Sequence, residues 1–343
     1  MPRDMIDPDL LGQKTVIGWG ASVAAVSTLA ASPLRPAWFI DANPAMHGAA
    51  LAGVPIRPPA ALADWLRAND RDDVFVIVFA YATRAVRAIF EQLAALGLEQ
   101  EVHYTDCSVL HHAPMTRQLG TRLHLDVDPD LFAAVRQHCL ASAVDNRSSI
   151  AGTWLIQALL RHHVHGVAGD IAEAGVYKGG SALMTLELAG DRLARRPYHL
   201  FDSFVGLAQV SVHDPTSRAG EFADVTAAAV ARRFTPFSNV HIHAGMFAER
   251  FADVADRQFG FVYVDCDLYE PAVDCCAFFY PRLAAGGVML FHDYWVDLDG
   301  LPLPAGAPEP FTGIRRAVDE LAARHGLDLV RFPQTTHALV LGR

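Results

Sequence analysis

The stretch that most constrains the fold is a short apolar strand that runs into an acidic residue and a glycine-rich turn, DIAEAGVYKGGS at residues 170–181. Two later stretches have the same design: a second apolar run ends in Asp202, and a third, YVDCDLYE at residues 263–270, ends in paired carboxylates. Ligands of open α/β sheets bind at the carboxyl ends of the strands, so we expect these segments to line one crevice. The sequence therefore predicts an α/β fold with a nucleoside cofactor beside a metal ion or a base.

The residue types in this crevice favour S-adenosylmethionine (SAM) over a dinucleotide. Gly175 and Gly180 would let the backbone approach a ligand that a Cβ atom would obstruct. Glu173 could meet the cationic amino acid end of SAM, and Asp202 could accept hydrogen bonds from the two ribose hydroxyls. A pyrophosphate would instead require an uncovered helix N-terminus and a tighter glycine pattern. Taken alone, the glycine pattern also fits a tight strand-to-helix turn without a ligand.

Six stretches in the second part of the chain carry a family resemblance. They are, in order, EAGVYKGG from Glu173, DSFVGL from Asp202, DCDLYE from Asp265, YPRLAAGG from Tyr280, HDY from His292 and GIRRAVDE from Gly313. Together they resemble the macrocin O-methyltransferase family, across residues 125–343 or close to it. The resemblance implies a class I methyltransferase fold, SAM as the methyl donor, and usually Mg²⁺ that holds a sugar diol while one hydroxyl is methylated.

The residues and the resemblance together predict a set of cofactor contacts. These are Glu173, Gly175, Tyr177, Lys178, Gly180, Ser181, Asp202, Ser203, Gly245 and Asp265. The resemblance places Gly245 near the adenine. Lys178 could contact the cofactor carboxylate or could simply face solvent.

The resemblance also implies a divalent metal ion, Mg²⁺ or another, bound by Asp265, His292 and Asp293. The family usually has tandem aspartates where this chain has His292 and Asp293. Magnesium prefers hard oxygen ligands, so an imidazole weakens the expected magnesium site. His292 could bind a softer divalent ion, act as a general base near neutral pH, or merely pack at a strand end.

The predicted catalytic residues are Asp265, Asp267 and His292. Asp267 is expected to support the metal or to accept a proton. Asp267 followed three residues later by Glu270 also resembles a capping box at the start of a helix over residues 268–279. The two roles are compatible.

The first third of the chain predicts a second, smaller Rossmann-like α/β unit. Strands are expected near residues 15–18, 37–41 and 74–80, and a helix over residues 85–96. Gly18 and Gly20 suit a dinucleotide turn, but Val23 occupies the usual third glycine position. Residues 12–108 also resemble the C-terminal domain of sugar C-methyltransferases, which implies a deoxysugar or nucleotide-sugar context but transfers no catalytic residue.

The periodicity breaks over residues 108–122, which include Pro114, so we expect the domain boundary there. The predicted domains are an accessory domain over residues 1–115 and a methyltransferase domain over residues 116–343. Helices expected within residues 130–165 could form a lid or a dimer surface. The irregular segments 208–221 and 295–311 are long for connections, which suggests acceptor-binding loops.

Composition limits the partners. The formal net charge of -10 disfavours a nucleic-acid partner, because binding phosphates needs a clustered positive surface. The longest apolar runs are too short to span a bilayer, and the start of the chain lacks the apolar core of a signal peptide, so a cytoplasmic protein without a membrane partner is expected. A homodimer is the commonest state of such enzymes.

The sequence thus predicts a SAM-dependent, metal-assisted O-methyltransferase that acts on a sugar hydroxyl of a glycoside, nucleotide sugar or natural product. The alternative is a non-catalytic nucleotide-binding or regulatory protein with a degenerate methyltransferase domain. An oxidoreductase that uses Gly18, Gly20 and Asp41 ranks last, because no hydride-site pattern accompanies them.

Overall fold

The computed structural model describes residues 11–21, 25, 28–29, 34–80, 82–144, 147–294, 312–332 and 335–342. These residues form two compact units. Unit 1 contains the described residues up to Ser142 and residues 147–151. Unit 2 contains residues 143–144, 152–294, 312–332 and 335–342. The segment 295–311, expected to be an acceptor loop, lies outside the described residues.

Unit 1 is built on a six-stranded sheet of order β3-β4-β2-β1-β5-β6. Its strands are β1 (Thr15–Trp19), β2 (Trp38–Ile40), β3 (Ala50–Leu51), β4 (Val54–Arg57), β5 (Val74–Val78) and β6 (Tyr104–Asp106). The neighbours pair in parallel except β3 with β4. Helices α3 (Ala60–Ala68) and α4 (Thr83–Ala95) connect the strands, and short 3₁₀ turns occur at Pro44–Met46 and Arg71–Asp73. This arrangement confirms the predicted Rossmann-like α/β unit.

The burial of strand β5 on both faces of the sheet explains why its sequence is continuously apolar. Phe75 and Ile77 belong to the hydrophobic core on one face of the sheet, while Val76 and Val78 belong to the core on the other face. A parallel strand that is covered on both faces needs apolar side chains in both directions. The run at residues 74–78 is therefore a central strand.

Helix α5 (Ser108–Leu123) corrects one expectation, because it fills the segment that was predicted to be an irregular linker. Its buried side chains recur at helical spacing, but two of them, Ser108 and His111, are polar. The next helix, α6 (Leu131–Ala141), also belongs to unit 1. Arg136 ties it to β6, donating to Asp106 Oδ2 at 2.6 Å. The two compact units therefore divide near Ser142, not near residue 115.

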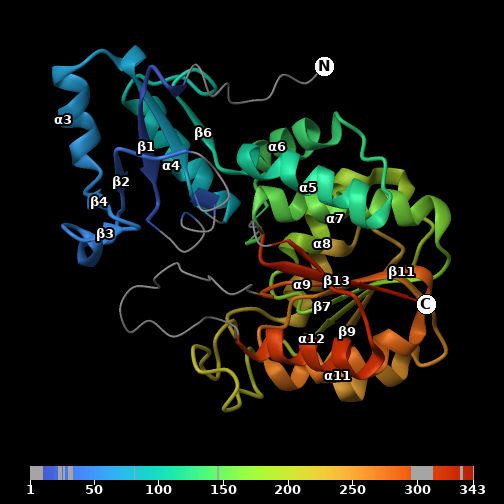
Figure 1. Ribbon diagram of the computed structural model, residues 1–343. Helices are drawn as coiled ribbons and strands as arrows, with labels where there is room; N and C mark the ends of the chain where they lie inside the picture. Colours follow the sequence, from blue (N-terminus) through green and yellow to red (C-terminus); the bar gives the residue numbers. More distant parts are fainter. Residues whose placement is uncertain are drawn as a thin grey trace. The chain divides into compact units, whose positions relative to one another are not determined.

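Unit 2 contains a seven-stranded sheet of order β12-β13-β11-β10-β7-β8-β9 (Figure 1). Its strands are β7 (Asp170–Ala174), β8 (Tyr198–Asp202), β9 (Val240–Ala244), β10 (Phe259–Val264), β11 (Leu283–Phe291), β12 (Val330–Phe332) and β13 (His337–Leu341). Strand β13 pairs antiparallel with both β11 and β12, and the other neighbours are parallel. Numbered within the unit, this order is 6-7-5-4-1-2-3 with the seventh strand reversed, which is the class I methyltransferase topology. The predicted fold is confirmed.

Helices cover both faces of this sheet, with α11 and α12 on one side and α7 and α8 on the other (Figure 1). The helices are α7 (Ile150–Gly166), α8 (Gly180–Ala189), α9 (Ala227–Phe234), α10 (Phe247–Arg250), α11 (Tyr269–Phe279) and α12 (Thr312–His325), with 3₁₀ turns at Gly190–Arg192, Phe251–Val254 and Tyr280–Arg282. Val262, Val264 and Phe291 pack against Phe279 and Leu321 in one core. Within the described part of the chain, no helix is both long and apolar enough to cross a membrane.

Candidate functional site

The glycine turn after β7 is shaped by its contact with the end of β10. Gly175 has a φ of 94°, and a Cβ atom there would lie 1.8 Å from the carbonyl oxygen of Asp265. Gly179 also has a positive φ, 78°, just before α8 begins at Gly180. Only glycine fits at Gly175, because both the backbone conformation and the space exclude a side chain. The turn therefore lies directly beside the strand end that carries Asp265.

Asp202, at the end of β8, holds this turn in place. Its Oδ2 atom accepts hydrogen bonds from the backbone N–H groups of Val176 at 2.8 Å and Tyr177 at 2.7 Å, and Oδ1 accepts from Phe204 N at 2.7 Å. A carboxylate has about four acceptor positions, so in this conformation Asp202 keeps roughly one for a ligand. The role of Asp202 as an acceptor for both ribose hydroxyls stays a prediction.

Glu173 is buried beside the turn, with 1% of its surface exposed. Its carboxylate accepts hydrogen bonds from Ser181 Oγ and, at 2.7 Å, from the hydroxyl of Tyr198. Burial, with the nearby charges of Asp265 and Asp202, outweighs these two hydrogen bonds and raises the pKa of Glu173 to about 7. Near neutral pH this side chain can lose a proton when a cation approaches.

The other predicted cofactor residues lie around the same turn. The Tyr177 hydroxyl and Lys178 Nζ both donate to Asp224, each at 2.6 Å. Ser203 Oγ donates to the carbonyl of Gly206, and the N–H of Gly245, whose φ is 142°, donates to the carbonyl of Asp202 at 3.0 Å. The structure thus brings these residues to the ends of β7, β8 and β9, although contact with a cofactor stays a prediction.

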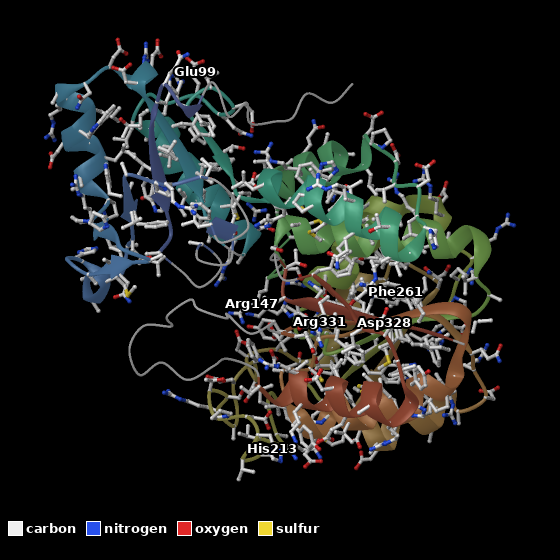
Figure 2. The ribbon with its side chains drawn as sticks, viewed as in Figure 1. Glu99, Arg147, His213, Phe261, Asp328 and Arg331 are labelled. Carbon is white, nitrogen blue, oxygen red and sulfur yellow. The ribbon has the colours of Figure 1, made fainter. Side chains whose placement is uncertain are left out.

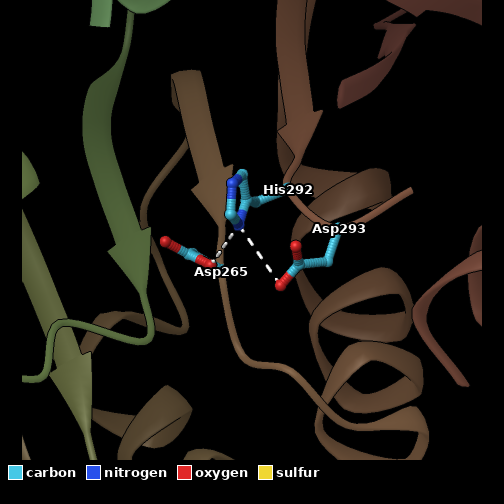
Figure 3. A group of neighbouring side chains, drawn as sticks. All are labelled: Asp265, His292 and Asp293. Carbon is cyan, nitrogen blue, oxygen red and sulfur yellow. Dashed lines mark hydrogen bonds and ion pairs between the residues drawn. The ribbon is translucent and has the colours of Figure 1, made fainter. Parts of the chain in front are cut away.

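Three of the predicted residues meet beyond β10 and β11 (Figure 3). His292 Nδ1 lies 2.8 Å from Asp265 Oδ1 and 3.3 Å from Asp293 Oδ2. One ligand atom from each of the three side chains lies within 4.8 Å of the other two. Asp293 reaches this position with a φ of 55°, a left-handed conformation that is uncommon outside glycine.

This cluster fits a divalent cation by its donor chemistry. Two carboxylates and one imidazole converge here. This mixed oxygen and nitrogen set suits ions such as Mn²⁺ better than it suits Mg²⁺, which prefers oxygen ligands. Tyr263 supports the cluster, since its hydroxyl donates to Asp265 Oδ2 at 3.3 Å. The assignment of Asp265, His292 and Asp293 as metal ligands stays a prediction that the geometry permits.

Asp267 lies next to the cluster with a φ of 63°. Desolvation and the charges of Asp293 and Asp265 raise the pKa of Asp267 well above its usual range. The predicted capping box is wrong, because α11 has Leu268 at its N-cap and no side-chain cap from Asp267. The first N–H of α11, that of Tyr269, instead donates at 2.8 Å to Asp214, a residue from the distant loop after β8.

Two residues near the site were missed from sequence. His337 is fully buried at the start of β13, 4.9 Å from the ring of His292, and burial with the charge of His292 lowers its pKa well below the usual range. Asp214 is also buried, with 2% of its surface exposed. A histidine that opens a predicted strand and an aspartate within a loop carry no motif, so neither position stood out.

Part of unit 2 matches a known protein family. Residues 154–299 match the macrocin O-methyltransferase (TylF) family. The match begins in α7, includes the glycine turn, and extends past Asp293. The resemblance to the macrocin O-methyltransferase family is therefore confirmed over this range, whereas the resemblance of residues 12–108 to sugar C-methyltransferases stays a prediction.

Two curated relatives are O-methyltransferases by name, and the name of the first includes a rhamnosyl group. The 8-demethyl-8-(2,3-dimethoxy-alpha-L-rhamnosyl)-tetracenomycin-C 4'-O-methyltransferase of Streptomyces olivaceus is 30% identical over 146 residues, which is 38% of this chain and 55% of that protein. The mycinamicin III 3''-O-methyltransferase of Micromonospora griseorubida is 27% identical over 176 residues, 47% of this chain and 63% of that protein. The chain thus spans less than two thirds of the length of each relative.

Among solved structures, the calicheamicin methyltransferase CalS11 is similar with a TM-score of 0.47 and 19% identity. The match covers 64% of this chain and 95% of that one.

Proposed function

We propose that unit 2 transfers a methyl group from SAM to a hydroxyl of a sugar-containing acceptor. The observation that carries the proposal is the arrangement of the matched region, in which the glycine turn, Asp202 and the cluster of Asp265, His292 and Asp293 follow neighbouring parallel strands. Cofactor and acceptor would therefore meet at one edge of the sheet, as in other open α/β sheets.

The cofactor would lie against the glycine turn. Gly175 packs this turn against the end of β10, and Glu173 offers a buried carboxylate for the cationic end of SAM. Binding of a cation would favour the ionised form of Glu173 and lower its raised pKa. The hydrogen bonds from Ser181 and Tyr198 stabilise that ionised form.

Methyl transfer is an in-line displacement at a sulfonium carbon, so the protein must align the acceptor oxygen and remove its proton. Asp265, His292 and Asp293 would hold a divalent ion, which lowers the pKa of a bound hydroxyl when it is present. His292, placed between two carboxylates, and Asp267 are the candidates for the proton acceptor. If His292 is a metal ligand, the proton goes to Asp267.

The finer features of the proposal concern partners and location. We propose a glycoside, nucleotide sugar or other sugar-containing natural product as the acceptor, because one curated relative is named for a rhamnosyl compound. We also propose a homodimer in the cytoplasm with neither a nucleic-acid nor a membrane partner. In unit 1, both carboxylate oxygens of Asp41 already accept hydrogen bonds from backbone N–H groups, those of Ala21 and Asn43.

Formation of S-adenosylhomocysteine (SAH) from SAM with a panel of sugar acceptors tests the proposal. We expect Asp265→Ala to reduce turnover by roughly 100-fold or more, the range of a lost acid, base or metal contribution. Asp256→Asn is the matched control, because its side chain is 86% exposed. Unchanged turnover and metal dependence in Asp265→Ala would show that the proposed site is wrong.

A further inference from the structure

The long loop between β8 and α9 is a closed structure although it contains no helix or strand. The N–H of Leu207 donates to the carbonyl of Glu221 at 2.9 Å, and the N–H of Gly220 donates back to Leu207 at 3.0 Å. The ends of the segment 207–221 therefore lie together. We call residues 207–224 the bridging loop; it is drawn in yellow in Figure 1.

The tip of the bridging loop is attached to the starts of α11 and α12 by Asp214. Its Oδ1 atom accepts from the N–H of Tyr269, the first residue of α11, and Oδ2 accepts from the N–H and hydroxyl of Ser211 at 2.9 and 2.7 Å. An anionic side chain at a helix N-terminus also meets a favourable dipole. This buried carboxylate replaces the local cap that the sequence predicted for α11.

The start of α12 is shaped to receive the same tip. Thr312 donates its hydroxyl to the carbonyl of His213 at 2.8 Å. The His213 ring packs edge-on against Tyr269, with 4.6 Å between the ring centroids. His213 is labelled in Figure 2. A Cβ atom at Gly313 would lie 2.0 Å from Asp214 Oδ1 and 2.9 Å from Tyr269 N. The glycine of the GIRRAVDE stretch is therefore explained by the docked loop and not by a turn.

The other end of the bridging loop is attached to the glycine turn by Asp224. Its two oxygens accept from the Tyr177 hydroxyl and from Lys178 Nζ, and Phe222 packs edge-on against Tyr177 at 5.2 Å. Two of the turn residues that were predicted to contact the cofactor, Tyr177 and Lys178, are thus bound to the loop. The loop connects the cofactor side of unit 2 to the start of α11, two residues beyond Asp267.

We infer that Asp214 and Asp224 are positioning residues, and that through them the bridging loop links occupancy of the glycine turn to the order of the acceptor side. The inference rests on the proposed function, because it takes the glycine turn as the SAM site. A ligand can shift the loop toward the attached state only if it binds that state more tightly than the detached state. The ratio of the two affinities gives the coupling, which can be measured.

Hydrogen–deuterium exchange of the full-length protein with and without SAH tests this link and needs no acceptor. In the wild type, SAH should slow exchange both at residues 175–181 and at residues 207–221. Asp224→Ala should keep the protection at 175–181 and lose that at 207–221. The SAH-dependent slowing of exchange at 207–221 should be about fivefold smaller than in the wild type, because the Lys178–Asp224 pair is partly exposed and such pairs are weak.

The tip contacts are tested by Asp214→Asn, which keeps the shape of the side chain, and by Thr312→Val, which removes one hydrogen bond and leaves Asp214 intact. Both should speed exchange at residues 211–214 and at the Tyr269 amide, by about tenfold in Asp214→Asn. Both should also reduce the SAH-dependent protection there, a change that a purely structural role would not produce. Asp256→Asn should behave as the wild type.

Three results would overturn the inference, and only the third would also overturn the proposed function. Protection at 175–181 without any SAH-dependent change at 207–221, or equal protection of the loop in wild type and Asp224→Ala, overturns the link while the cofactor site stands. No protection at 175–181 in the wild type overturns the link together with the proposed function.

Discussion

Glu173 makes a prediction about stability and pH at the scale of one residue. Its pKa is raised from 4.5 to about 7 in the folded protein. Between these values the folded state binds a proton that the unfolded state releases, so this residue's contribution to stability decreases as the pH rises from 4.5 to 7. The full loss is on the order of 3 kcal/mol, as an upper value for a shift of this size.

We therefore expect Glu173→Gln to raise the melting temperature at pH 8 and to leave it nearly unchanged at pH 4.5. The same variant should bind SAM more weakly, because the cation loses its buried counter-charge. Glu249→Gln, at an exposed position, is the control. Equal shifts of the melting temperature at both pH values would contradict the raised pKa.

His292 makes a second prediction at this scale, about metal preference. His292→Asp would create the tandem aspartates that the macrocin O-methyltransferase family usually has, and three carboxylates form a harder ligand set than two carboxylates and an imidazole. The ratio of Mg²⁺ to Mn²⁺ affinity, measured by calorimetric titration, should rise by about tenfold over the wild type. His241→Asp, at an exposed position on β9, should leave the ratio unchanged. If the ratio is unaltered in His292→Asp, His292 is not a metal ligand.

At the scale of the elements, the strands that carry the site could be predicted because each joins an apolar run to a distinctive polar end. Asp202, Asp265 and the glycine turn follow β8, β10 and β7 as expected. The helix α5 was missed since its buried face includes Ser108 and His111, and the latter lies within 2.8 Å of Thr28, a partner 83 residues away. Contacts between distant residues, such as Asp214 with α11, leave no periodic signal in the sequence.

The glycine turn makes the prediction that belongs to this scale. Gly175→Ala should destabilise the protein by more than about 3 kcal/mol, because a Cβ atom would overlap the Asp265 carbonyl and the φ of 94° is unfavourable. Gly326→Ala is the matched control, because its φ is also positive, 60°, but no atom lies within 4 Å of the added Cβ, and it should cost about 1–2 kcal/mol. Chemical denaturation gives both values, and equal costs would contradict the close packing of the turn on β10.

At the scale of the whole molecule, two α/β units share one chain, and the match to the macrocin O-methyltransferase family begins in the second unit. The fold of both units followed from the sequence, since alternating strands and helices and the order of the motifs specify parallel sheets. Their boundary did not, because α5 and α6 stay with unit 1 through contacts such as that of Arg136 with Asp106. The identity of the acceptor could not be predicted, since the geometry of binding loops leaves no periodic signal in the sequence.

The central claim is that the glycine turn of unit 2 is a SAM site, and titration of the full-length protein with SAH in a calorimeter tests it most directly. The titration is repeated with Mg²⁺ and with NAD⁺ as the competing ligand. We predict saturable binding with a Kd near the micromolar range, on the order of -8 kcal/mol, that NAD⁺ does not displace. Binding of NAD⁺ without any heat from SAH would contradict the claim and move the function to unit 1.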